Sequence, residues 1–173
     1  HIMKTKHLFI VLSFFTILSC KDNCKDTIWD FMNYEFFISV VNESGENLLD
    51  PETENNLLDG GVWITYKDKT YDIVEIQPIE TRATMPEPLS LRHYPEDEEN
   101  PRSLLLGFGE FSPTDEHKRE EFTIHWEDGT SDKVAFDCYI TGSNCNPKVQ
   151  KALYLNDKLI SNKEYDELVF TKK

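Results

Sequence analysis

The sequence predicts an all-β fold, and within that class an immunoglobulin-like β-sandwich of short antiparallel strands. Apolar and polar residues alternate in several short runs, which is the two-residue period of a half-buried strand. Turn-forming residues separate these runs at intervals of about 8–12 residues, as in sandwiches and barrels. Helical periodicity is almost absent. The Cys–Trp–Cys spacing of antibody domains is absent. The prediction therefore concerns the architecture only.

The first predicted strands lie between residues 34 and 76. Phe36, Ile38 and Val40 share one face of a strand near residues 34–42. An acidic loop at residues 46–60 follows it. The next two runs form a hairpin around a tight turn. The hairpin comprises Val62, Ile64 and Tyr66, the turn at residues 67–69 and a return strand at residues 70–76.

The middle of the chain changes character. Residues 77–101 hold five of the eight prolines, and proline lacks the N–H group that a central strand must donate. We therefore expect only a short edge strand at residues 89–94 and an exposed acidic tip at residues 95–100. An apolar strand at residues 103–108 comes next, and then a single helical turn at residues 113–116, capped by Thr or Ser.

Two hairpins and a final strand complete the predicted domain. The first hairpin has the clearest signal, because Asp128 and Gly129 supply a turn whose left-handed torsions glycine accepts without steric cost. Its arms carry Phe122, Ile124 and Trp126 before the turn and Val134, Phe136, Cys138 and Ile140 after it. The second hairpin joins residues 149–155 to residues 158–161, and residues 167–171 form the last strand.

The N-terminal residues have the pattern of a secretory signal peptide. Lys4 and Lys6 give a basic start, and an apolar run of eleven residues at 8–18 ends at the small residue Ser19. Such a run covers only about half of the ~30 Å hydrocarbon core of a bilayer, which disfavours a transmembrane helix. Residues 1–2 precede Met3 and are interpreted as a cloning remnant.

The end of the apolar run, Ile17-Leu18-Ser19-Cys20, resembles a bacterial lipobox. The resemblance implies that Cys20 is the lipidation site and becomes the mature N-terminus. It divides the chain into a signal peptide at residues 1–19, a lipidated tether at residues 20–32 and a single β-sandwich domain at residues 33–173. A cleaved signal without lipid and an uncleaved anchor are the alternatives.

The chain is strongly acidic, with a net charge of −14. Residues 1–19 carry Lys4 and Lys6 and no acidic residue, so their removal lowers the net charge to −16. This charge argues against nucleic acid as a partner and against direct adsorption on anionic lipid headgroups. We therefore expect the protein to reach the membrane through its lipid anchor.

The four cysteines are Cys20, Cys24, Cys138 and Cys145. If Cys20 is acylated, Cys138 and Cys145 are the expected disulfide, because they are close in sequence and bracket a turn-like segment. An extracytoplasmic location permits that bond. Cys24 is then expected to be unpaired. Two free thiols at Cys138 and Cys145 are the alternative, and their spacing is not that of a zinc site.

No catalytic residue is predicted. The chain has no Gly-x-Ser-x-Gly nucleophile elbow. A Cys–His pair of His125 with Cys138 or Cys145 is disfavoured, because cysteines of exported domains usually pair with each other. His93, His117 and His125 show no zinc-binding spacing. Carboxylates are abundant, but any acidic surface offers pairs like those of glycosidases.

No metal site or cofactor is predicted, although Ca²⁺ is the most credible ion. Oxygen-rich segments at residues 50–59 and 128–132 suit Ca²⁺, but neither has the EF-hand spacing. A solvated loop and a β-turn explain the same residues. Trp63 is the candidate glycan contact, because it is out of phase with Val62 and Ile64 and an exposed ring can stack on a sugar. Packing on a second buried face is the alternative.

The order of these segments resembles small lipoproteins of Bacteroidetes to which no activity is assigned. The shared features are the signal with Cys20 and the segments 41–50, 64–71 and 126–132. The resemblance spans most of the chain and implies an outer-membrane lipoprotein of the cell envelope.

Two features of the tether add to this resemblance. The charged residues 21–26 resemble the export signals of surface lipoproteins in that phylum, which implies a domain on the cell surface. Asp26-Thr27-Ile28 resembles its O-glycosylation pattern, so Thr27 is a candidate glycosylation site.

The sequence thus predicts a lipid-anchored envelope module that binds a protein or a glycan and is not an enzyme. The alternatives are a carbohydrate-binding module, an envelope hydrolase with an unrecognised site, and a subunit whose edge strand accepts a strand from another chain. Exposed aromatic residues on a flat face would favour binding. A concave pocket with convergent polar groups would favour an enzyme.

Overall fold

The computed structural model describes residue 24 and residues 27–75, 89–161 and 167–173. These residues form ten strands and one short 3-10 helix, which confirms the prediction of an all-β fold. No helix in this part of the chain has the length and hydropathy needed to cross a membrane. The predicted signal peptide and Cys20 lie outside the described residues.

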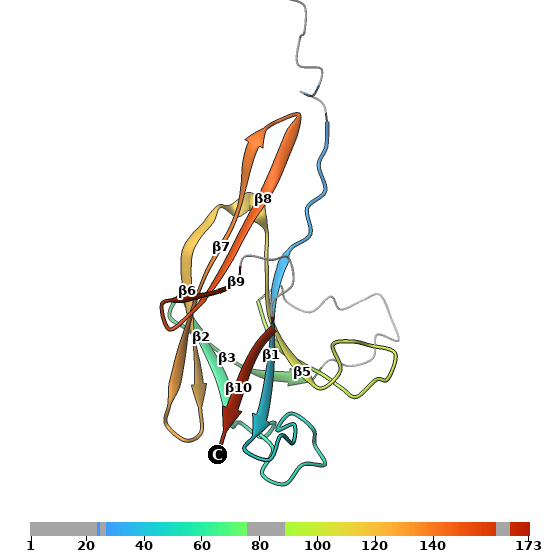
Figure 1. Ribbon diagram of the computed structural model, residues 1–173, viewed down its shortest axis with the longest axis vertical. Helices are drawn as coiled ribbons and strands as arrows, with labels where there is room; N and C mark the ends of the chain where they lie inside the picture. The colour runs from blue at the N-terminus through green and yellow to red at the C-terminus, as the bar shows by residue number, and fades with distance from the viewer. Residues whose placement is uncertain (1–23, 25–26, 76–88, 162–166) are drawn as a thin grey trace, which may run out of the picture. The chain divides into compact units, whose positions relative to one another are not determined.

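The elements follow one another in the order shown in Figure 1. The strands are β1 (Tyr34–Asn42), β2 (Val62–Tyr66), β3 (Lys69–Glu75), β4 (Leu91–Tyr94), β5 (Leu105–Phe111), β6 (His117–Trp126), β7 (Ser131–Ser143), β8 (Asn146–Leu155), β9 (Lys158–Ser161) and β10 (Glu167–Lys172). The 3-10 helix η2 (Pro113–Asp115) confirms the predicted helical turn, and the Ser112 side chain caps it by accepting from Thr114 N.

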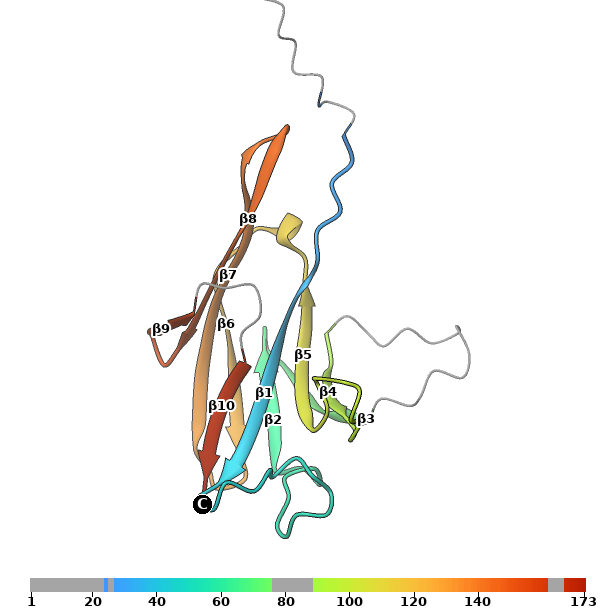
Figure 2. The same ribbon diagram turned by 45° about the vertical axis from the view of Figure 1, so that its right-hand side comes forward.

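The ten strands form one continuous sheet in the order β10-β1-β5-β4-β3-β2-β6-β7-β8-β9. Figure 2 shows β10, β1 and β5 side by side. The sheet is mixed, because β10 is parallel to β1 and β4 is parallel to β3. The expectation of short antiparallel strands is therefore wrong in two respects, since β7 also has 13 residues.

Strand β3 connects the two halves of the sheet. Residues 69–72 pair with β2, and residues 73–75 pair with β4. The two halves face each other across an aromatic core. The rings of Phe36 and Phe122 are 5.1 Å apart between centroids, and those of Trp126 and Phe170 are 5.0 Å apart. The apolar residues named for the alternating runs therefore share one core, with the exception of Ile140.

The predicted hairpin turns are confirmed. Lys67 and Asp68 both have positive φ, 48° and 61°, in the two-residue turn between β2 and β3. Gly129 has a φ of 79° between β6 and β7. Both turns use left-handed torsions, which match the twist of the strands that they join.

Strand β4 is not the edge strand that the prolines suggested. It pairs with β3 on one side and with β5 on the other. Its four residues contain no proline, so every backbone N–H remains able to donate. Proline density around a segment therefore did not exclude a short central strand.

Candidate functional site

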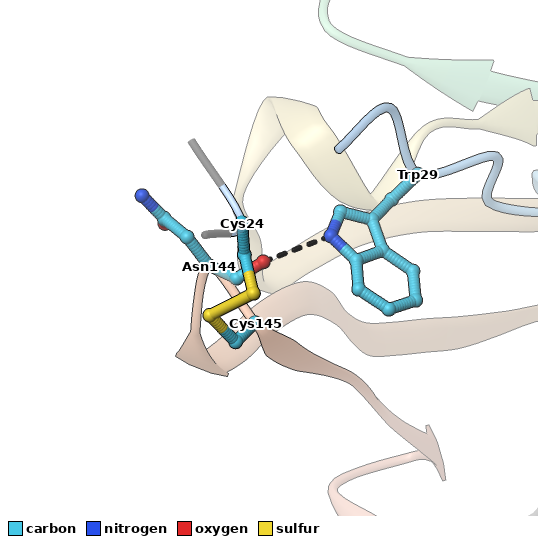
Figure 3. Close-up of a disulfide and its surroundings, with 4 residues drawn as sticks. All are labelled: Cys24, Trp29, Asn144 and Cys145. Atoms are coloured by element: carbon cyan, nitrogen blue, oxygen red, sulfur yellow. Dashed lines mark hydrogen bonds between the residues drawn. A yellow bond between two sulfur atoms is a disulfide. The ribbon is translucent and has the colours of Figure 1, made fainter. Parts of the chain in front are cut away.

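A disulfide organises a small unit formed by the described residues near the N-terminus and residues 142–148. Cys24 is bonded to Cys145, 121 residues later in the chain, with 5.1 Å between their Cα atoms (Figure 3). Within the same unit, the indole N–H of Trp29 donates to the Asn144 carbonyl at 2.9 Å. These two contacts attach Cys24 and Trp29 to the turn between β7 and β8.

The disulfide differs from the expected Cys138–Cys145 pair. Cys138 is a free thiol with no exposed surface, and burial raises its pKa to about 11. A turn was expected soon after Cys138. The chain instead continues as strand β7 to Ser143. The alternating pattern therefore directs Cys138 into the core and leaves Cys145 to Cys24.

Residues 27–30 are exposed to solvent. Thr27 is exposed, and its backbone N–H donates to the Cys24 carbonyl at 3.2 Å. Its hydroxyl is thus in an accessible position for the O-glycosylation predicted from sequence. Ile28 is 95% exposed and Trp29 is 45% exposed.

Trp63 lies on the face of β2 opposite to the core, and it is partly exposed, which is one of the two alternatives that its phase left open. Strand β2 buries Val62, Ile64 and Tyr66, whereas Trp63 is only partly buried. The Trp63 ring stacks on His125 of β6, with 5.4 Å between centroids and 8° between planes. The His125 Nε2 atom is 2.9 Å from the Thr65 hydroxyl, which holds the imidazole ring in place. We call this pair the Trp63–His125 stack.

Polar groups surround the Trp63–His125 stack. Asp72 of β3 is the neighbour of Trp63 in the register, and Thr70 and Thr123 flank Thr65. A ring with hydroxyl groups and a carboxylate beside it suits a hydroxyl-rich ligand, because the ring packs on C–H groups while the oxygens accept and donate. This face is the candidate binding site of the protein.

A pocket of about 130 Å³ lies beside Trp126. The two acidic segments that sequence reasoning considered for Ca²⁺ meet there, because Glu54 and Asn55 come from one and Asp128 comes from the other. Lys172 lines the same pocket.

Lys172 already forms ion pairs with acidic side chains at this pocket. Its Nζ atom lies 4.3 Å from the Trp126 ring centroid and 3.0 Å from the Thr130 hydroxyl. It is also 3.9 Å from carboxylate oxygens of Asp128 and Asp132. Thr130 also hydrogen-bonds to Asp128, which lowers the pKa of that carboxyl. No group of three or more metal-ligating side chains occurs among the described residues.

Sequence reasoning missed a polar network centred on Glu120. Its carboxylate accepts from the Tyr66 hydroxyl at 2.7 Å and from His117 Nδ1 at 2.5 Å, and it also pairs with Lys67. Burial opposes ionisation of Glu120, but these hydrogen bonds lower its pKa to about 2. A β-bulge between His117 and Glu120 turns both side chains to the same face. No pattern in the sequence predicts this bulge.

The Glu120 network is better suited to holding strands together than to acid–base chemistry. Burial and the bond to Glu120 raise the pKa of Tyr66 to about 12. Nε2 of His117 is buried and has no hydrogen-bond partner within the described chain. With these pKa values, Glu120 and Tyr66 keep their charge states at neutral pH and transfer protons poorly.

The described structure thus brings some predicted residues together and separates others. Trp63 gains His125 as a partner, while Cys145 bonds to Cys24 rather than Cys138. No protein-family model, curated protein or solved structure matches this chain.

Proposed function

We propose that this protein is an outer-membrane lipoprotein of the cell envelope, with its domain on the cell surface, that binds a ligand rather than transforming one. The observation that carries the proposal is the Cys24–Cys145 disulfide. Disulfides form and persist in oxidising, extracytoplasmic compartments. The bond closely follows Cys20, where the sequence resembles a lipobox, so two independent features support export.

The ligand that we propose is a glycan, bound at the Trp63–His125 stack. The partly exposed indole, the threonine hydroxyls and Asp72 supply the aromatic and polar contacts that a sugar needs. The protein would then serve as a carbohydrate-binding module. We further propose that the curled sheet belongs to the immunoglobulin-like sandwiches in architecture, which the facing of its two halves supports.

Metabolic labelling with a palmitate analogue tests the anchor. We expect the wild-type protein to be labelled and Cys20→Ser to be unlabelled. Cys138→Ser is the matched control, because its thiol is buried and it should keep the label. Equal labelling of the wild type and Cys20→Ser would contradict lipidation at this residue.

A glycan array tests the ligand. The soluble Cys20→Ser protein should bind at least one class of glycan, and Trp63→Ala in the same background should lose that binding. Val169→Ala is the control, since Val169 is an exposed apolar residue of β10. Binding that survives Trp63→Ala, or no binding to any glycan, would contradict this site.

A further inference from the structure

We infer that Ile28 and Trp29 contact the headgroup layer of the membrane, so that the disulfide-bonded unit rests on the lipid surface. The inference rests on the proposed function, because it requires acyl chains on Cys20. It adds a second point of membrane contact made by side chains. The expected partner is the interfacial region of a phospholipid bilayer.

Exposure of apolar side chains is the first observation. Ile28 is 95% exposed, more than any other large apolar side chain in the described chain, and Trp29 beside it is 45% exposed. Exposed apolar groups that lie together mark interaction sites. Tryptophan favours the membrane–water interface, because its ring is amphipathic.

The hydrogen bonding of Trp29 removes an obstacle to this contact. Its indole N–H, the only polar group of the side chain, already donates to the Asn144 carbonyl at 2.9 Å. An unpaired donor would lose its hydrogen bonds to water on entering a lipid environment. Because this donor is satisfied within the protein, the ring can leave water without that loss.

The disulfide supplies the connection to the anchor. Cys24 is fixed to Cys145, and Trp29 is fixed to Asn144 in the same turn. Only three residues separate Cys20 from Cys24. Even a fully extended chain of this length spans at most about 14 Å. Acyl chains on Cys20 would therefore hold the disulfide-bonded unit close to the bilayer surface.

Charge distinguishes this unit from the rest of the mature chain. From Cys20 on, its residues (20–30 and 142–148) contain three lysines and three aspartates, so their net charge is zero. All of the net charge of −16 belongs to the remaining residues. Anionic headgroups repel acidic segments within about a Debye length. The disulfide-bonded unit is the part of the protein that such a surface does not repel.

Quenching of tryptophan emission by brominated phosphatidylcholine tests the inference. The full-length lipidated protein is reconstituted into phosphatidylcholine vesicles with and without the brominated lipid, and intact mass confirms the lipid on Cys20. We expect the brominated lipid to reduce the emission of the wild type and to leave Trp29→Phe unquenched. Quenching that is absent in the wild type, or equal in both proteins, would overturn the contact.

A second pair of variants keeps Trp29 as the reporter. Ile28→Ser removes the apolar neighbour and should weaken the quenching, whereas Val169→Ser removes an exposed apolar residue of β10 and should leave it unchanged. Equal effects of the two variants would also overturn the inference. An unmodified Cys20 in the mass measurement would contradict the proposed function itself, so the two failures are distinguishable.

Discussion

Glu120 connects the end of one strand to the start of another. Tyr66 ends β2, Lys67 begins the turn after it, and His117 opens β6, yet all three donate to one carboxylate. Lys67 has a positive φ of 48°, which a non-glycine residue adopts at a steric cost. Its pairing with Glu120 helps to hold that turn in place.

The Glu120 network makes stability depend on pH in the acidic range. The pKa of Glu120 falls from an ordinary value of 4.5 to about 2. A lowered folded-state pKa stabilises the protein above the ordinary value, and this contribution is lost as the pH falls through the folded-state value. After allowance for solvent screening, Glu120→Gln should lower the free energy of unfolding by about 1–2 kcal/mol at neutral pH. Urea unfolding should show that this difference in free energy of unfolding between the wild type and Glu120→Gln disappears between pH 4.5 and about 2.

Glu121 provides the matched control. It is the next residue in β6, its side chain is 51% exposed, and it pairs with Lys133 at 3.4 Å. Exposed ion pairs contribute little, so Glu121→Gln should change the free energy of unfolding by less than about 0.5 kcal/mol. An equal loss in both variants, or a gap for Glu120→Gln that does not depend on pH, would contradict the role given to Glu120.

Single elements show which parts of the fold are predictable from sequence. The turns at Lys67–Asp68 and Asp128–Gly129 were predicted, because their left-handed torsions are a local property of the chain. The phase of Trp63, opposite to Val62 and Ile64, was predicted from the alternation of the strand, which is also a local property. The parallel pairs β1–β10 and β3–β4 were not, because alternation shows which face of a strand is buried but not which strand lies beside it.

The disulfide links the N-terminal segment to the turn between β7 and β8. It closes a loop of 121 residues that contains most of the sheet. A cross-link of this kind stabilises mainly by restricting the unfolded chain, and the effect grows with loop length. The expected pairing missed this link, because proximity in sequence does not measure proximity in the fold.

The double variant Cys24→Ser/Cys145→Ser should therefore be less stable than its parent. In a Cys20→Ser background, the free energy of unfolding should fall by about 2–4 kcal/mol, as measured by urea unfolding without reductant. Dithiothreitol should lower the stability of the parent to that of the double variant and leave the double variant unchanged. A parent that is insensitive to dithiothreitol would show that the bond does not form.

In the sheet as a whole, the aromatic core determines whether the two halves unfold together. Alternating runs predicted most of the buried residues of β1, β2, β6 and β7, but they could not distinguish one curled sheet from two separate sheets. In the structure, Phe136 of β7 lies 4.8 Å from Phe36 of β1 and 4.6 Å from Phe111 of β5, measured between ring centroids. These two rings belong to the half of the sheet opposite to strand β7, whereas Phe122 and His117 of β6 contact the same ring from its own half.

Phe136→Ala tests whether the sheet unfolds as one unit. Removing a buried phenylalanine ring costs about 3–5 kcal/mol. Because this ring touches strands from both halves, the loss should lower the midpoint of a single transition. Urea unfolding followed by far-ultraviolet circular dichroism and by tryptophan emission should give coincident curves. Val169→Ala, at a residue that is 62% exposed, should have almost no effect. If the core is shared, neither half can unfold alone. Two separate transitions in Phe136→Ala would show that each half has its own stability and would contradict a shared core.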